Sequence, residues 1–352
     1  MDKLISIIIP CYNVEKYIDR CFDSLLRQTI GFDKLEIIMV DDCSSDHTWD
    51  RLAAIEAAYP ESVMIIHCDE NGHQGRARNI GLQYASAPYV GYVDSDDWIE
   101  PDMYEKLYQK MSVHHCDIVM CRNWRDTALP DQMLEPKLTG AADRILQIDT
   151  VEKRKIFIVC GSIEYVAWGK LFPREFLIRN DVFFPEGLAY EDHFFATLLY
   201  FYARKVYILE ERLYHYYVNP ASTVLSSNAA HHFDILTVDK MMWSECENRG
   251  FLNEYRREVE YQFLTLCYLA AMKMISLRLT HVPYDFFLEL KEETLQRIPD
   301  YHQNPYIKDY VTEMNQILLR LLDLPISEQD LNAVCDAVRL KYGIHPNEEK
   351  QE

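Results

Sequence analysis

Three carboxylates fall within four consecutive positions of this chain, in the segment Asp94-Ser95-Asp96-Asp97. The segment directly follows the apolar run at residues 89–93, which is typical of a buried strand. Like charges this close repel one another, and a nearby cation relieves the repulsion. A hard divalent metal held by oxygens is the natural candidate, and its commonest second partner is a diphosphate. The cluster therefore indicates nucleotide-phosphate chemistry.

Three more polar segments follow predicted strands nearer the N-terminus. Residues 10–13, Pro-Cys-Tyr-Asn, form either a plain strand-ending turn or a shelf for a flat nucleotide base. Residues 41–42, Asp-Asp, either shape a turn or accept a hydrogen bond from a pyrimidine imide N–H. Residues 71–79 combine a glycine loop with two arginines, and Arg78 is the better candidate to bind a phosphate or a base. Arg76 is better explained by a solvated helix face.

A further segment, residues 187–195, places Glu191 and Asp192 among aromatic side chains. Asp192 either caps the helix that follows it or serves as a general base. Aromatic neighbours partly desolvate a carboxylate, and desolvation raises its basicity. The second interpretation makes Asp192 a candidate to take a proton from a hydroxyl group.

Strands and helices alternate through about the first 115 residues. Continuous apolar strands are predicted at residues 4–9, 35–40, 63–67 and 89–93, with helical spacing between them. This alternation predicts a parallel sheet that helices cover on both faces, and ligands bind beyond the C-terminal strand ends of such sheets. The polar segments lie at such ends. This shared position is stronger evidence for a ligand-binding site than any single motif.

The rest of the chain changes character. Residues 116–228 are mixed, and from about residue 229 the chain is nearly all helix. We therefore expect a domain at residues 1–228, a helical region at 229–346 and a polar tail at 347–352. The most apolar helical stretch, residues 263–277, is too short to span a bilayer and predicts a core helix. The C-terminal helices lack a strongly basic face, so packing is favoured over docking on a membrane surface or dimerisation.

The composition excludes several classes of protein. The 352 residues include 36 basic and 56 acidic ones, a formal net charge of −20, which excludes nucleic-acid binding through a general basic face. The ten cysteines contain no CxxC pair, and several lie in apolar runs, as in reduced cytosolic proteins. The first residues start a strand at once and show no export signal. We expect a cytoplasmic protein, with peripheral association with the inner face of the membrane left open.

The order of these motifs resembles the family 2 glycosyltransferases with a GT-A fold. The ordered motifs are Pro-Cys-Tyr-Asn at 10–13, Asp-Asp-x-Ser-Ser-Asp at 41–46, Asn-Gly-x-x-x-x-Ala-Arg-Asn-x-Gly at 71–81, Asp-Ser-Asp-Asp at 94–97 and Glu-Asp at 191–192. Residues 167–172 also resemble the family's Trp-x-Lys-Leu segment, although Gly169 stands where Asn is commoner. The resemblance covers about residues 4–225, and its specificity comes from the order and spacing of motifs that are weak singly.

The resemblance implies a role for each matching residue. The base and nearby nucleotide groups would be held by a set of strand-end residues: Pro10, Tyr12, Asp41, Arg78, Asp94 and Ser95. Asp96, with Asp94, would ligate Mn²⁺ or Mg²⁺ across the diphosphate. Asp192 would deprotonate the acceptor hydroxyl, and Trp168 and Glu191 would shape the acceptor side. His215 is a candidate third metal ligand, although a packed histidine explains it better.

The resemblance predicts a hexosyltransferase-type enzyme. It would move a sugar with inversion from a nucleotide diphosphate, UDP in particular, to a hydroxyl of a glycan or lipid-linked acceptor in bacterial cell-surface polysaccharide synthesis. One base suffices for this single displacement, and a metal stabilises the leaving group. Two alternatives remain: a metal-dependent sugar nucleotidyltransferase, which would usually have a Gly-rich basic loop after the first strand, and a non-catalytic protein that binds sugar nucleotides. The oligomeric state is open.

Overall fold

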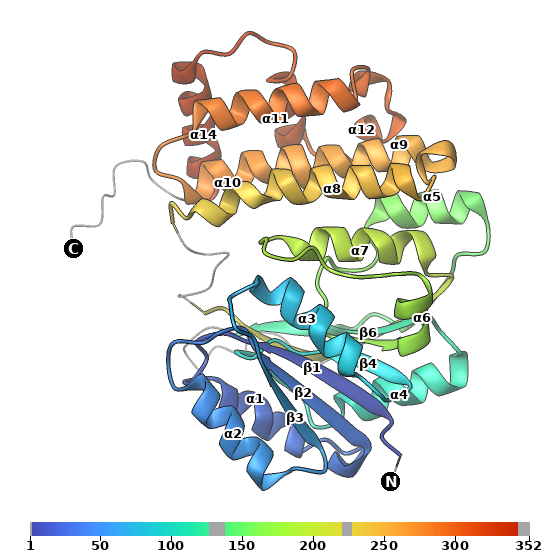
Figure 1. The fold of residues 1–352 in the computed structure, drawn as a ribbon. Coiled ribbons are helices and arrows are strands. Elements are labelled where there is room, and N and C mark those ends of the chain that lie inside the picture. Colours follow the sequence, from blue (N-terminus) through green and yellow to red (C-terminus); the bar gives the residue numbers. More distant parts are fainter. Residues whose placement is uncertain (1, 127–137, 220–226, 344–352) are drawn as a thin grey trace. The chain divides into compact units, whose positions relative to one another are not determined.

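The computed structural model describes residues 2–126, 138–219 and 227–343, which fall into two compact units (Figure 1). The sheet unit comprises residues 1–154 and 163–219, and the helical unit comprises residues 155–162 and 220–352. All predicted site residues belong to the sheet unit. The predicted polar tail at 347–352 lies outside the described residues.

The N-terminal half of the sheet is parallel, as predicted. Its strands run in the order β3-β2-β1-β4, and their bounds are β1 (Ile5–Cys11), β2 (Leu35–Asp41), β3 (Val63–His67) and β4 (Tyr89–Tyr92). Every residue of β1 is buried, which explains its continuous apolar sequence. The register pairs Cys11 with Asp41 and Asp41 with His67, so the C-terminal ends of three strands lie side by side.

The sheet has nine strands among the described residues, and its other half is mixed. Its strands are β5 (Trp98–Ile99), β6 (Ile118–Asp126), β7 (Arg144–Gln147), β8 (Lys170–Pro173) and β9 (Lys205–Tyr217). β8 pairs antiparallel with β4 and β6, and β9 pairs antiparallel with β5 and β7 but parallel with β6. The predicted predominance of parallel pairing therefore holds only for the first half. After about residue 116 strand and helix no longer alternate, so crossover connections no longer impose parallel pairing.

Helices cover both faces of the sheet. They are α1 (Ile18–Leu26), α2 (Thr48–Ala58), α3 (His73–Tyr84), α4 (Met103–His114), α6 (Arg174–Arg179) and α7 (Glu191–Tyr202), with a 3₁₀ turn at Phe32–Lys34. A further helix, α5 (Val151–Cys160), has most of its residues in the helical unit. Apolar side chains of α1, α2 and α4 share one core with alternate residues of β1 and β2. α3 packs on the other face, where a Cβ at Gly81 would lie 2.3 Å from Ile8 Cγ2. Glycine there permits the close approach that places Arg78 over the strand ends.

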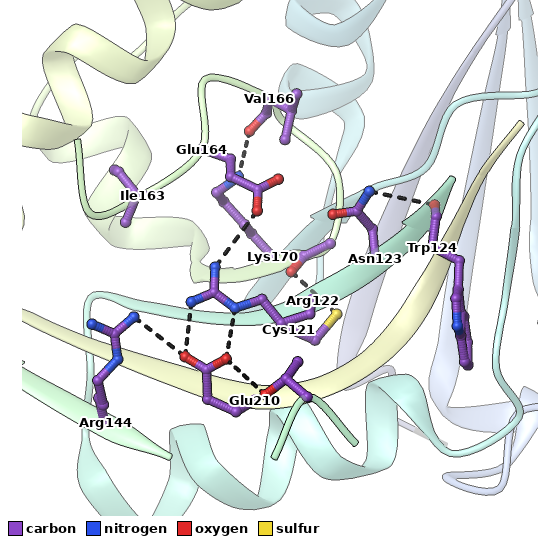
Figure 2. A network of polar contacts seen from close by, with 12 residues as sticks. Cys121, Arg122, Asn123, Trp124, Arg144, Ile163, Glu164, Val166, Lys170 and Glu210 are labelled. Carbon is purple, nitrogen blue, oxygen red and sulfur yellow. Dashed lines mark hydrogen bonds and ion pairs between the residues drawn. The ribbon is translucent and has the colours of Figure 1, made fainter. Parts of the chain in front are cut away.

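A polar network fixes β6, β7 and β9 to one another (Figure 2). Arg122 of β6 binds Glu210 of β9 through two hydrogen bonds of 2.9 and 2.8 Å, and Arg144 of β7 lies 3.2 Å from the same carboxylate. The bidentate contact with Arg122 holds the pKa of Glu210 below its ordinary value. Close by, the buried Lys170 ammonium donates to the carbonyl of Val166 at 2.6 Å, which ties down the chain entering β8.

The helical unit contains α8 (Asp234–Asn248), α9 (Leu252–Gln262), a π-helical segment (Phe263–Leu269), α10 (Ala270–Arg278), α11 (Tyr284–Arg297), α12 (Pro305–Tyr310), α13 (Glu313–Arg320) and α14 (Glu328–Lys341). Short 3₁₀ turns occupy Ala230–Phe233 and Tyr301–Gln303. The predicted core helix falls on the π segment and α10, where most apolar side chains are buried. Among the described helices, none has both the length and the apolar character needed to cross a membrane.

Candidate active site

The aspartate loop, residues 94–97, follows β4 at the C-terminal edge of the parallel strands. Asp97 points inward, because its carboxylate accepts hydrogen bonds from the Tyr214 hydroxyl at 2.6 Å and the Tyr217 amide at 2.7 Å. The Tyr214 hydroxyl in turn accepts a hydrogen bond from the Asp94 amide at 3.1 Å. These contacts anchor the loop to β9 and leave the Asp94 and Asp96 side chains partly exposed.

The partly exposed carboxylates of the loop carry charge that the protein only partly balances. Burial and the neighbouring Asp94 charge raise the pKa of Asp96 above its ordinary value. Asp96 Oδ2 accepts a hydrogen bond from Asn219 at 3.3 Å, and its main-chain carbonyl accepts one from Arg20 at 2.6 Å. A cation beside Asp96 would relieve this repulsion.

The loop fits a metal that a substrate helps to hold. Among the described residues, no three His, Cys, Asp or Glu side chains gather as a complete metal site. A Mg²⁺-type ion bound with nucleotides needs only one or two protein carboxylates, since phosphates and waters fill the other positions. Asp94 and Asp96 supply hard oxygen donors of this kind, and the raised pKa of Asp96 fits a carboxylate that lacks a cation. These two residues could therefore hold the predicted ion.

Arg78 joins the aspartate loop to the predicted base. Its guanidinium is 3% exposed and donates to Asp94 Oδ1 at 2.7 Å and to Glu191 Oε1 at 2.5 Å. Burial disfavours its charge, but Asp94 and Glu191 more than offset this and raise the pKa of Arg78 above its ordinary value. In this arrangement Arg78 faces two carboxylates rather than the open edge, so the structure favours a positioning role over direct contact with a nucleotide.

Asp192 and Glu191 begin α7. Tyr190 occupies the N-cap position with a φ of 64°, and no side chain caps this helix, so the capping interpretation of Asp192 is not supported. Glu191 is 1% exposed and also accepts a hydrogen bond from Gln74 at 2.7 Å. Asp192 is partly exposed, and burial together with the Glu191 charge raises its pKa to about 6. It combines access with raised basicity, as a general base requires.

The residues predicted to hold the base differ in access. Pro10 is buried in β1, Ser95 is 6% exposed, and the Tyr12 ring that follows β1 is 50% exposed. The Asp41 side chain is fully enclosed: Oδ2 lies 2.8 Å from His67 Nδ1, and Oδ1 accepts a hydrogen bond from the Ser44 amide at 3.3 Å. His67 is the last residue of β3, and its side chain is 45% exposed where that of Asp41 is buried.

Trp168 and His215 are held within aromatic stacks. The buried Trp168 ring stacks on Tyr214 with centroids 4.4 Å apart. The His215 ring lies between Trp98 and Trp124, at 4.8 and 4.4 Å. Its Nε2 lies 2.9 Å from a Glu100 oxygen, and its Nδ1 lies 2.8 Å from an Asp126 oxygen. Both ring nitrogens already have carboxylate partners, so the geometry favours the packed histidine over a metal ligand.

Several site residues escaped the sequence analysis. They are Arg20 and Asn219 on the aspartate loop, Gln74 on Glu191, Tyr214 under Asp97, and His67 on Asp41. Most reach the site from distant segments, and their local sequence carries no signal of it. Only His67 had such a signal. It ends the predicted strand at residues 63–67, and the other candidate residues also lie at the ends of predicted strands.

Comparison with known proteins identifies this arrangement. Residues 6–166 match the model of the family described as glycosyl transferase family 2. The chain contains a family 2 glycosyltransferase domain. Among curated proteins, a glycosyltransferase of Bacillus subtilis strain 168, EpsJ, described as uncharacterized, is 35% identical over 224 residues. That alignment covers 63% of this chain and 63% of EpsJ, so it spans less than two thirds of the relative.

Solved structures resemble this chain in fold. A crystal structure of Staphylococcus aureus TarS 1–349 in complex with UDP-GlcNAc has a TM-score of 0.70 at 18% identity, covering 97% of this chain and 92% of that chain. A Pyrobaculum calidifontis mannosyltransferase in complex with GDP-Man and Mn²⁺ has a TM-score of 0.52 at 14% identity, covering 100% of this chain and 89% of that chain. The predicted GT-A fold with a helical C-terminal region is confirmed, and so is the predicted glycosyltransferase family.

Proposed function

We propose that the protein is an inverting glycosyltransferase that moves a sugar from a UDP-sugar to a hydroxyl of a glycan or lipid-linked acceptor. The observation that carries this proposal is the bridge from Asp94 through Arg78 to Glu191, beside Asp192. The bridge connects the loop at residues 94–97, whose carboxylates suit a metal bound to a diphosphate, with the start of α7, where Asp192 is the more basic carboxylate. The TarS structures with UDP-GlcNAc and with UDP support a uridine nucleotide as the donor.

Asp192 is assigned the role of general base. Its pKa of about 6 leaves it ionised at neutral pH, yet more basic than an ordinary aspartate. It would take the proton from the acceptor hydroxyl as that oxygen attacks the anomeric carbon. The C–O bond to the diphosphate breaks as the new glycosidic bond forms. A single displacement inverts the anomeric centre, so one base suffices.

Asp94 and Asp96 are assigned to the donor diphosphate. They would hold Mn²⁺ or Mg²⁺, whose positive charge stabilises the negative charge that the leaving diphosphate gains. Arg78 forms ion pairs with both Asp94 and Glu191 and so balances part of their negative charge. Asp192, which is partly exposed, is then the carboxylate proposed to meet the acceptor hydroxyl.

The acceptor and cellular setting follow the sequence-based expectation. TarS carries the name poly(ribitol-phosphate) beta-N-acetylglucosaminyltransferase, and it is 26% identical to this chain over 262 residues, which make up 43% of TarS. That name supports an acceptor of the bacterial cell surface. We propose a cytoplasmic enzyme and keep peripheral association with the membrane as part of the proposal. The buried Trp168 would act on the acceptor side by supporting Tyr214 and the chain around it.

Purified full-length protein with MnCl₂ and a panel of UDP-, GDP- and dTDP-sugars tests the proposal through donor hydrolysis and transfer to glycan acceptors. Asp192→Asn should lower transfer by about 10²–10⁴-fold with donor affinity kept within a few fold. Asp23→Asn, an exposed aspartate on α1, is the matched control and should behave like the parent. Equal turnover by the Asp192 variant would overturn the assignment of Asp192 as the base. No turnover of any sugar nucleotide by the parent would overturn the proposed enzyme and favour a non-catalytic binding protein.

A further inference from the structure

The guanidinium of Arg20, in the first turn of α1, contacts the main chain of the aspartate loop. Its Nη2 donates a hydrogen bond to the carbonyl oxygen of Asp96 at 2.6 Å, across 76 positions of sequence. Within the described part of the chain, this is the hydrogen bond that Arg20 makes, and no carboxylate there lies within ion-pair distance of it. In a chain with a net charge of −20, an arginine that binds this carbonyl instead of a carboxylate points to a role at the loop.

Two aromatic rings hold the Arg20 guanidinium in place. Its Cζ lies 4.0 Å from the centroid of the Trp98 ring and 4.8 Å from that of the Tyr217 ring. Trp98 in turn stacks on His215, with ring centroids 4.8 Å apart and an angle of 14° between the rings. A cation over an aromatic face is attracted by the ring, and such contacts restrict the rotamers of a long side chain. The guanidinium therefore has a fixed position against β5 and β9.

Arg20 acts on Asp96 through position and through charge. The hydrogen bond is made to the main-chain carbonyl, so it fixes the residue without occupying the carboxylate oxygens that are proposed to bind the cation. Burial and the Asp94 charge raise the pKa of Asp96, and the positive charge of Arg20 opposes that rise. Both effects favour an ionised Asp96 carboxylate that is held in one place.

We propose that Arg20 is a positioning residue that holds Asp96 where its carboxylate can bind the divalent cation of the donor complex. The inference rests on the proposed function, because that function brings a cation and a nucleotide diphosphate to the loop. A ligand group that is already ordered loses less conformational entropy when the cation binds, so the cation binds more tightly. Loss of the Arg20 contact should therefore weaken the cation and leave the contacts of the nucleotide itself unchanged.

Calorimetric titration of UDP into the full-length protein, repeated over a range of MnCl₂ concentrations, tests this inference. Arg20→Met keeps an unbranched apolar side chain against the rings but removes the hydrogen bond and the charge. It should raise the MnCl₂ concentration that gives half of the Mn²⁺ effect by about tenfold, as expected for one hydrogen bond from a charged donor. UDP affinity without MnCl₂ should not change. Arg20→Lys, which retains a charged donor, should restore part of the Mn²⁺ effect. Arg27→Met is the matched control, because Arg27 is an exposed arginine directly after α1, and it should bind like the parent.

Each outcome decides the inference. If the parent shows the Mn²⁺ effect and Arg20→Met keeps the same half-effect concentration, Arg20 does not position Asp96, while the proposed function still stands. Tighter Mn²⁺ binding by Arg20→Met would also overturn the inference, because it would show that the arginine mainly repels the cation. If UDP affinity of the parent does not depend on Mn²⁺, the metal assignment of the proposed function fails and the inference fails with it. Circular dichroism at the titration temperature checks that each variant is folded, and Arg20→Lys decides the matter if Arg20→Met unfolds.

Discussion

Two acidic strand ends look alike in sequence and differ in the structure. Asp41 ends β2 and is fully enclosed, with a hydrogen-bond partner for each oxygen. Asp96 follows β4, is partly exposed, and has its pKa raised by burial and by Asp94. The contrast indicates that a carboxylate at a strand end is suited to bind a cation only when no other group of the protein balances its charge. Asp41 contacts the neighbouring His67 ring, whereas the charge of Asp96 would be balanced by a bound cation.

Of the two strand-end aspartates, Asp96 should have the larger effect on activity when it is substituted. Asp96→Asn removes the ligand proposed for the metal, and transfer should fall by about 10²–10³-fold, the size of loss seen when one group that stabilises a transition-state charge is removed. The raised pKa means that the fold disfavours the charged form, so ionised Asp96 costs stability above its ordinary pKa. The unfolding temperature at pH 7 should stay equal or rise. If Asp96→Asn lost activity because it unfolds, the proposed difference between Asp96 and Asp41 would be wrong.

Removing Arg78 should cause the largest loss of stability. Arg78→Met leaves the Asp94 and Glu191 carboxylates without their buried cation, which should cost about 3–5 kcal/mol in the free energy of unfolding. The exposed pair of Arg51 with Asp19 is the control, and Arg51→Met should cost less than about 1 kcal/mol. Urea denaturation measures both. Equal costs for the two variants would contradict the structural role given to Arg78.

Substituting Asp41 should weaken the fold, opposite to the effect at Asp96. Asp41→Asn replaces a carboxylate that His67 and Ser44 both contact, so the free energy of unfolding should fall by about 1–2 kcal/mol. The same substitution at the two strand ends therefore gives a matched pair. Thermal unfolding of both variants at pH 7 sharpens the comparison. A drop in stability at Asp96 but not at Asp41 would reverse it.

The pH profile should reveal the raised basicity of Asp192. The base works only when ionised, so kcat/KM should halve near pH 6 and fall about tenfold by pH 5. An aspartate with its ordinary pKa of 3.8 would keep nearly full activity at pH 5. Rates measured between pH 4.5 and 8 with fixed MnCl₂ check this. A profile that is flat down to pH 5 would argue against Asp192 as the base.

The sequence predicted the parts of the fold that depend on local pattern. Apolar runs located β1 to β4, and motif order led to the family and the GT-A fold, both confirmed by comparison. The mixed pairing of β5 to β9 was not predictable from sequence. These strands are not joined by regular strand–helix–strand connections, so tertiary packing decides which strands pair. β9 in particular is a strand of 13 residues, Lys205–Tyr217, in a region whose sequence pattern was only mixed.

The environments of the site residues depend on contacts that local sequence does not contain. Arg78 was taken for a nucleotide-binding group, yet its partner Glu191 lies 113 positions further along the chain. Asp41 was predicted either to shape a turn or to bind the base, and the contact with His67 of the next strand was not predicted. Residue types and strand ends therefore located the site, and only the packing separated the residues that face a ligand from those that orient others.

The most direct test of the central claim is calorimetric titration of UDP into the full-length protein with and without MnCl₂. If the Asp94 and Asp96 carboxylates hold a cation across the diphosphate, UDP should bind at least about tenfold more tightly with Mn²⁺ present. In Asp96→Asn that difference should disappear. Tight binding of UDP that is the same with Mn²⁺, without Mn²⁺ and in the Asp96 variant would contradict the claim.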